Sequence, residues 1–145
     1  MSDGASTFED TLIADMREHD GAVTFGPLAG YPLLIMTSKG AKTGEPRRSI
    51  LTWSRDGNDY VVAGTATGSP RDPAWLRNVN ADPDVTIEVA NRTFVAKAAI
   101  VGGQDRLRLW DQHVATLPWF AAYPAQTGRE IPLVRLTPAT NDVDR

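Results

Sequence analysis

With 145 residues, 41% of them hydrophobic, the chain can bury one good core but is too short for two ordinary domains, so residues 1–145 are expected to form a single domain. Its formal net charge of -3 argues against nucleic acid or an anionic membrane as the main partner, because both attract positively charged surfaces. The absence of cysteine excludes disulfides, thiolate nucleophiles and cysteine metal sites, and no apolar run approaches the roughly 20 residues that span a bilayer. The acidic start lacks a leader pattern, so we expect a cytoplasmic protein without membrane insertion.

The first half of the chain reads as one helix followed by strands. In the N-terminal segment 1–20, a helix is expected over 5–19, because apolar residues recur every four positions. Strands are then predicted over 31–38, 47–53 and 59–64. An Asp-Gly pair between the last two is a strong hairpin signal, so these two strands are expected to pair antiparallel.

The second half alternates helices with strands. A helix is predicted over 72–83, with Asp72 as its cap and Pro73 at its first position. Strands over 85–90 and 93–101 form a second hairpin, and a last strand covers 131–138. A helix over about 104–117 is expected to present one apolar stripe, made of Leu107, Trp110, Val114 and Leu117.

These elements favour a mainly β, α+β fold. Six or so antiparallel strands with peripheral helices are typical of a sheet curled into a barrel, whose core here spans residues 31–138. The regular βαβ alternation of a doubly wound parallel sheet is missing.

The turn at residues 37–48 is the strongest candidate for a binding site. Its glycines let the backbone approach a ligand, Lys42 offers a mobile charge, and Arg47 can bind phosphate or carboxylate in a bidentate manner. The alternative is a solvated hairpin turn whose lysines only aid solubility. The turn is not a Walker loop, because its Lys-Thr pair precedes the closing glycine and does not follow it.

Two other segments can contribute to a site. The loop at 64–71 leads into a helix N-terminus, which favours an anion or a polar ring edge, although Asp72 can occupy the same donors and such loops are common. Aromatic residues near positions 110–123 pack as core or line a cleft over a flat ring. His19 and His113 lack metal-ligand spacing, so we expect no metal and place both at the surface or at helix ends.

Three motifs in order resemble one known family: GAKTGEPR after an apolar strand, DPAWLRN, and YPAQTGREIP near the end. Over about residues 31–138 the chain resembles the deazaflavin (F420)-dependent nitroreductase family, a branch of the split β-barrel flavoproteins. The resemblance implies a split β-barrel that uses reduced coenzyme F420 as hydride donor. F420 is a deazaflavin with a phosphodiester and an oligoglutamate tail, so the basic turn would meet its negative charge. FMN is the alternative cofactor.

The resemblance also implies roles for particular residues. Lys42 and Arg47 correspond to ligands of the phosphate and the tail. The full set of implied cofactor-binding residues is Lys39, Lys42, Thr43, Gly44, Pro46, Arg47, Ala63, Gly64, Thr65, Ala66, Thr67, Gly68, Trp75 and Asn78. Thr65 and Tyr123 are the implied catalytic residues, and the acceptor would contact Leu117, Phe120 and Tyr123.

Departures from the family pattern narrow the expected acceptor. Ala41 and Ala66 stand where family members often have a cation, and Leu117 and Phe120 stand where nitroimidazole-reducing members have tyrosines. We therefore expect hydride transfer to a small hydrophobic acceptor, such as an activated alkene (an α,β-unsaturated ester, lactone or enone) or a quinone, more than to a nitroaromatic. An FMN-dependent split-barrel oxidoreductase and a non-catalytic F420- or haem-binding protein remain alternatives, and the oligomeric state stays open.

Overall fold

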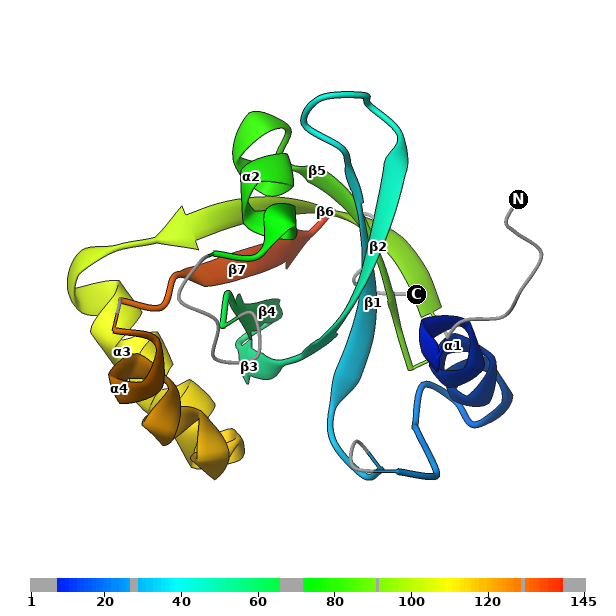
Figure 1. Cartoon of the computed structure of the whole chain (residues 1–145), viewed down its shortest axis with the longest axis horizontal. Helices are drawn as coiled ribbons and strands as arrows, with labels where there is room; N and C mark the ends of the chain where they lie inside the picture. Colours follow the sequence, from blue (N-terminus) through cyan, green and yellow to red (C-terminus); the bar gives the residue numbers. More distant parts are fainter. Residues whose placement is uncertain (1–7, 27–28, 66–71, 91, 129, 140–145) are drawn as a thin grey trace.

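The computed structural model describes residues 8–26, 29–65, 72–90, 92–128 and 130–139. Its strands form one antiparallel seven-stranded sheet with the order β2-β1-β5-β6-β7-β4-β3 (Figure 1). The strands are β1 (Leu33–Lys39), β2 (Pro46–Thr52), β3 (Ser54–Asp56), β4 (Asp59–Ala63), β5 (Asp84–Val89), β6 (Arg92–Val101) and β7 (Leu133–Pro138). The helices are α1 (Phe8–Glu18), α2 (Ala74–Ala81), α3 (Gly103–Thr116), the short 3-10 helix η2 (Pro118–Ala122) and α4 (Tyr123–Thr127).

The two edge strands of the sheet are neighbours in the sequence. Only Trp53 separates β2 from β3, although these strands lie at opposite ends of the strand order. The sheet must therefore curl until its two ends approach each other, and Figure 1 shows this half-barrel. The predicted class, an antiparallel sheet curled into a barrel with peripheral helices, is confirmed.

The pairing of the strand predicted over 47–53 differs from the expectation. Over its whole length β2 pairs with β1, from Leu33 opposite Thr52 to Lys39 opposite Pro46. After Trp53 the chain crosses to the other edge of the sheet, where the separate strand β3 forms the expected hairpin with β4. The sheet thus has seven strands instead of six, because the continuous segment 46–56 forms two strands, β2 at one edge of the sheet and β3 at the other.

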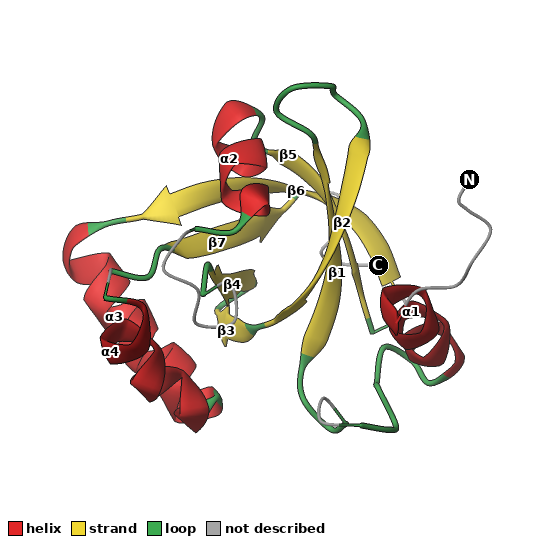
Figure 2. Cartoon of the chain, viewed as in Figure 1, coloured by secondary structure: helices red, strands yellow, loops and turns green. Residues whose placement is uncertain are grey.

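Apolar clusters lie on both faces of the curled sheet. Alternate residues along β4 face opposite sides, so Tyr60 and Val62 join the core inside the curl while Val61 and Ala63 join an outer cluster. Helix α3, η2 and α4 cover this outer cluster, and α1 covers a third cluster on the outer face of β1 (Figure 2). Helix α2 packs against the inner core through Trp75, Leu76 and Val79.

The helices begin and end close to their predicted limits. Helix α2 starts at Ala74, so Pro73 occupies the cap position that was assigned to Asp72. In α3 the predicted apolar stripe is partly wrong, because Leu107 is 59% exposed. Its fully buried residues are Leu109 and His113, four positions apart, and they face β3 and β4.

The two histidines have different environments. His19 follows α1 and is exposed, as expected, whereas His113 lies in the last turn of α3 and is fully buried. The Nδ1 atom of His113 lies 2.7 Å from Ser54 Oγ, and burial lowers its pKa to about 4. Among the described residues, no group of His, Cys, Asp or Glu side chains could hold a metal ion, and no helix is long and apolar enough to cross a bilayer.

A network of charged side chains joins β3, β4, β7 and α3 on the outer surface. Asp56 accepts hydrogen bonds from Arg108 at 3.1 and 3.2 Å and from Arg135 at 2.6 Å. Arg135 also donates to Asp59, and both arginines donate to Asp105. The hydrogen bonds from Arg108 and Arg135 lower the pKa of Asp56 to about 2.

Replacing Asp56 by asparagine is expected to lower the Tm by about 2–4 °C at neutral pH, because a networked ion pair is lost. The folded-state pKa of Asp56 lies below its unfolded value, so its stabilisation is present above about pH 4 and disappears as the pH falls toward about 2. Thermal melts of both proteins across this pH range test the prediction. The difference in Tm should shrink in acid, and a constant difference would contradict it.

Candidate functional site

The basic turn between β1 and β2 has a closed backbone. Gly40 N donates to Glu45 O and Gly44 N donates to Gly40 O, both at 2.8 Å. Gly44 has a φ of 76°, a conformation that side chains other than glycine rarely adopt. These two bonds fold residues 40–45 into a tight loop at the end of the β1–β2 hairpin.

Asn78 ties this turn to α2. Its Oδ1 accepts a hydrogen bond from Ala41 N at 3.0 Å, and its Nδ2 donates to Ser38 Oγ at 3.4 Å. Asn78 and Ser38 are 8% and 1% exposed. The amide group that sequence reasoning assigned to the cofactor therefore contacts the protein itself and positions the turn.

A cavity of about 540 Å³ lies between the basic turn and α2. Of the residues predicted to bind the cofactor, it brings together Lys42, Thr43, Arg47, Trp75 and Asn78. Trp75 is only 6% exposed and is also part of the inner core. The remaining lining residues are Gly40, Ala41, Arg48, Ser49, Ala74 and Arg77.

All charged side chains that line this cavity are positive. Lys42, Arg47, Arg48 and Arg77 line it, and none of the described lining residues is acidic. Arg48 lies within the predicted turn but is not among the implied cofactor-binding residues, and Arg77 was missed by sequence reasoning. Helical spacing is the signal that could have found Arg77, because residues at i, i+3 and i+4 share a helix face and Ala74, Arg77 and Asn78 all line the cavity.

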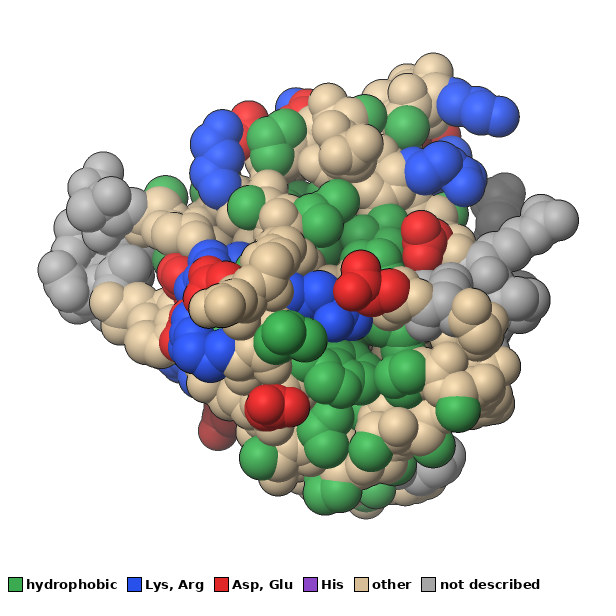
Figure 3. Space-filling model, turned by 90° about the vertical axis from the view of Figure 1, so that its left-hand side faces the viewer, with side chains coloured by type: hydrophobic (Ala, Val, Ile, Leu, Met, Phe, Trp, Pro, Cys, Tyr) green, Lys and Arg blue, Asp and Glu red, His purple; other side chains and the backbone are tan. Residues whose placement is uncertain are grey.

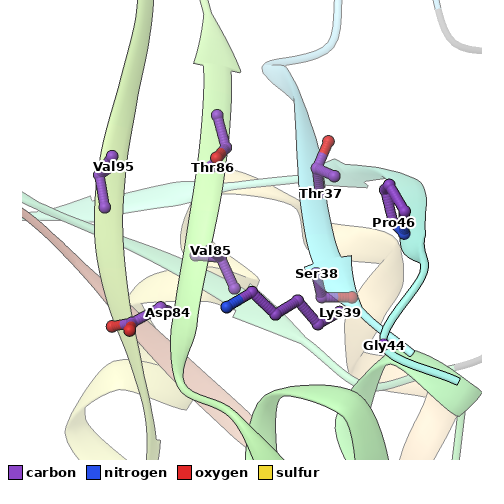
Figure 4. Close-up of a pocket in the computed structure, with 9 residues that line it drawn as sticks. All are labelled: Thr37, Ser38, Lys39, Gly44, Pro46, Asp84, Val85, Thr86 and Val95. Carbon is purple, nitrogen blue, oxygen red and sulfur yellow. The ribbon is translucent and has the colours of Figure 1, made fainter. Parts of the chain in front are cut away.

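A second cavity, of about 290 Å³, lies on the other side of the turn (Figure 4). Lys39, Gly44 and Pro46, all predicted to bind the cofactor, line this second cavity and not the first. In Figure 4 Lys39 extends toward Val85 on β5, and its Nζ lies 3.3 Å from Asp82 Oδ2. The pKa of Asp82 is lowered by the backbone N–H of Asp84 and by Lys39. The cofactor-binding residues predicted on the turn are therefore divided between the cavities on its two faces.

The segment after β4 lies between α2 and the aromatic segment, residues 117–123, which comprises η2 and the residues at either end of it. Gly64 N donates to Pro132 O at 2.9 Å, and a methyl group added at Gly64 would lie 2.5 Å from Leu76 Cδ1 on α2. Its neighbour Ala63 belongs to the outer apolar cluster under α3 and α4. Thr65 follows and is partly buried. The predicted ligands Ala66, Thr67 and Gly68 lie outside the described residues.

The residues predicted to contact the acceptor are mostly in the core. Leu117 and Phe120 are 1% and 5% exposed and belong to the outer cluster together with Ala63. Tyr123 is partly buried and packs edge-on against Phe120, with ring centroids 5.2 Å apart. Neither cavity described above is lined by these three residues. Figure 3 shows many hydrophobic side chains on the lower half of the face where α3 and α4 lie.

Comparison with known proteins identifies the class. A solved F420-H2 dependent reductase (FDR-A) superimposes with a TM-score of 0.67 at 28% identity, covering 72% of this chain and 93% of that one. A haem-binding protein from Mycobacterium smegmatis shares the fold at 16% identity, with a TM-score of 0.57 and coverage of 73% and 46%. The curled sheet and its helices are thus those of the split-barrel fold, which this chain shares with both proteins.

Sequence similarity identifies the family within that class. Residues 11–138 match the family model described as F420H(2)-dependent quinone reductase. The F420H(2)-dependent quinone reductase Rv1261c of Mycobacterium tuberculosis is 38% identical over 109 residues, which is 73% of either chain. The chain belongs to the F420H(2)-dependent quinone reductase family. This confirms the predicted resemblance and, at the level of the family, the predicted cofactor F420.

Proposed function

We propose that this chain is an F420H2-dependent oxidoreductase that reduces a small, electron-poor organic acceptor. The observation that carries the proposal is the cavity between the basic turn and α2, whose charged lining residues are all basic. It occurs in a protein whose family is defined by dependence on F420H2.

The residues of the cavity suit the anionic part of F420. A phosphodiester and a chain of glutamates need several cations, and Lys42 and Arg47 stand on the turn where both can meet one anion. Each charge-assisted hydrogen bond contributes about 1.5–3 kcal/mol where it is shielded from water. Arg47 has only a long ion pair of 3.6 Å with Glu45, so its guanidinium can turn toward a stronger anion.

Residues 63–65 suit the ring end of the cofactor, since they lie between α2 and the aromatic segment. Here the backbone of Gly64 and Thr65, continued by Ala66, Thr67 and Gly68, would hold the ring edge. When bound, reduced F420 supplies the hydride. The protein's part is to orient the ring and the acceptor and to exclude water.

The acceptor class follows from the aromatic segment and from the relatives. A quinone or an activated alkene suits a site beside the partly buried Tyr123, which packs against the apolar cluster that contains Phe120 and Leu117. The quinone reductases among the relatives favour a quinone. With two of the three tyrosines of nitroimidazole-reducing members absent, nitroaromatics are expected to react slowly. Tyr123 and Thr65 carry hydroxyl groups that can donate a hydrogen bond or a proton to the acceptor oxygen.

Replacing Tyr123 by phenylalanine is expected to change the acceptor profile and leave F420 affinity within about twofold. Loss of one donor to the developing oxyanion should lower kcat/KM by about tenfold for acceptors that need it. Steady-state kinetics with a quinone, an enone and a nitroaromatic check this. Equal losses for all three acceptors together with weaker F420 binding would contradict the assignment of Tyr123 to the acceptor side.

A competition between cofactors tests the proposed function. The purified protein is titrated with F420 and with FMN, and oxidation of the reduced form is followed against enones, quinones and nitroaromatics. We expect tight binding of F420, weak binding of FMN and turnover with quinones or enones. A protein that purifies yellow would instead support the FMN enzyme, and F420 binding without turnover would support the non-catalytic alternative. The predicted cytoplasmic location remains a prediction.

A further inference from the structure

Two basic side chains of the cavity stand out because they have no partner. Within the part of the chain that the structure describes, Lys42 and Arg77 are the Lys and Arg residues whose side chains have no hydrogen bond or ion pair. In contrast, Arg48, which lines the same cavity, donates to Asp10 of α1 at 2.9 Å. The positive charge of Lys42 and Arg77 is therefore uncompensated in a protein whose net charge is -3.

The fold brings these two residues to one place. Lys42 stands on the turn and Arg77 on α2, and both line the same cavity. The hydrogen bond from Ala41 N to Asn78 Oδ1 joins their immediate sequence neighbours at 3.0 Å. Because consecutive Cα atoms are about 3.8 Å apart, this bond holds the backbones of Lys42 and Arg77 close together.

Two like charges held together without a counter-ion favour an anion that bridges them. A single phosphodiester can engage the turn alone, through Lys42 and Arg47. An anion that also reaches α2 must carry further negative groups along a chain, as a row of glutamate carboxylates does. Arg77 is exposed on α2, so a flexible tail can reach it from solvent.

We propose that Arg77, together with Lys42, forms a subsite for the carboxylates of the F420 tail, and that this subsite makes affinity rise with the number of glutamates. This inference rests on the proposed function. It assigns Arg77, which sequence reasoning missed, to tail recognition and not to the phosphodiester or to the ring.

Fluorescence titrations with three ligands test the subsite: F420 with a long tail, F420 with a short tail, and the deazaflavin chromophore without phosphate or glutamates. Wild type is compared with Arg77→Ala, with Arg77→Lys and with the matched control Lys97→Ala, which removes a charge on β6 outside the cavity. We expect Arg77→Ala to weaken long-tail binding by about fivefold and short-tail binding by less than about twofold. Arg77→Lys should retain most of the preference, and Lys97→Ala should retain all of it.

The outcomes distinguish failure of the subsite from failure of the proposed function. Equal weakening of both tail lengths in Arg77→Ala, or no change in either, would overturn the subsite while F420 binding stands. Failure of wild type to bind any of the three ligands would overturn both. Melting of the ligand-free proteins adds an independent readout: Arg77→Ala should melt at or above the wild-type temperature, because it relieves repulsion. A lower melting temperature together with equal loss for both tails would show a structural role instead.

Discussion

Replacing both Lys42 and Arg47 by alanine is expected to weaken F420 binding by about a hundredfold or more. Both side chains line the cavity between the turn and α2, and together they account for two charge-assisted contacts of about 1.5–3 kcal/mol each before solvent screening. Both are exposed in the free protein, so the fold should not change. Titration of the oxidised cofactor by fluorescence measures the loss, and unchanged affinity would refute the assignment of the basic turn.

The same titration of Lys39→Ala separates the two faces of the turn. Lys39 lies three residues before Lys42 but lines the second cavity and pairs with Asp82. We therefore expect its removal to change F420 affinity by less than about threefold, an effect of charge alone. A loss as large as that of the double variant would show that Lys39 contacts the cofactor, as the family resemblance implies.

Replacing Asn78 by alanine is expected to lower both stability and F420 affinity. It leaves Ala41 N–H and the buried Ser38 hydroxyl without their partner, which costs about 1–3 kcal/mol and lowers the Tm by about 3–10 °C. Without this link the turn is no longer held against α2, so F420 affinity should fall by about tenfold.

Thermal melts and F420 titrations of Asn78→Ala and Asn80→Ala check this pair of effects. Asn80 is an exposed amide on the same helix, and its loss should leave both quantities nearly unchanged. Lower F420 affinity with an unchanged Tm would indicate that Asn78 binds the cofactor directly. No effect on either quantity would refute its role in positioning the turn.

Local signals predict much of this fold. Hairpins at the Asp56-Gly57 pair and at the turn after β5 follow from residues adjacent in sequence, and the structure contains both. The crossing at Trp53 does not follow from such signals. The run from Arg47 to Trp53 is equally suited to pair with the strand before it or with the strand after it, and only the closure of the whole sheet decides.

The sequence predicts which segments form the candidate site, but it does not predict where their side chains lie. The cations at Lys39, Lys42 and Arg47 are visible in the sequence, whereas their division between two cavities depends on which face of the hairpin each occupies. Burial of Asn78 under the turn requires knowing how α2 docks on β1. Arg77 lies within the DPAWLRN motif, but the sequence does not show that the face of α2 that carries it turns toward the cavity.

The central claim is that this protein passes a hydride from F420H2 to an organic acceptor, and anaerobic mixing tests it most directly. Protein, F420H2 and a simple naphthoquinone are combined, and the fluorescence of oxidised F420 is followed. We predict oxidised F420 to appear at a rate proportional to protein concentration, one equivalent for each quinone reduced. Oxidation no faster than without protein, for quinones, enones and nitroaromatics alike, or turnover that requires reduced FMN, would contradict the claim.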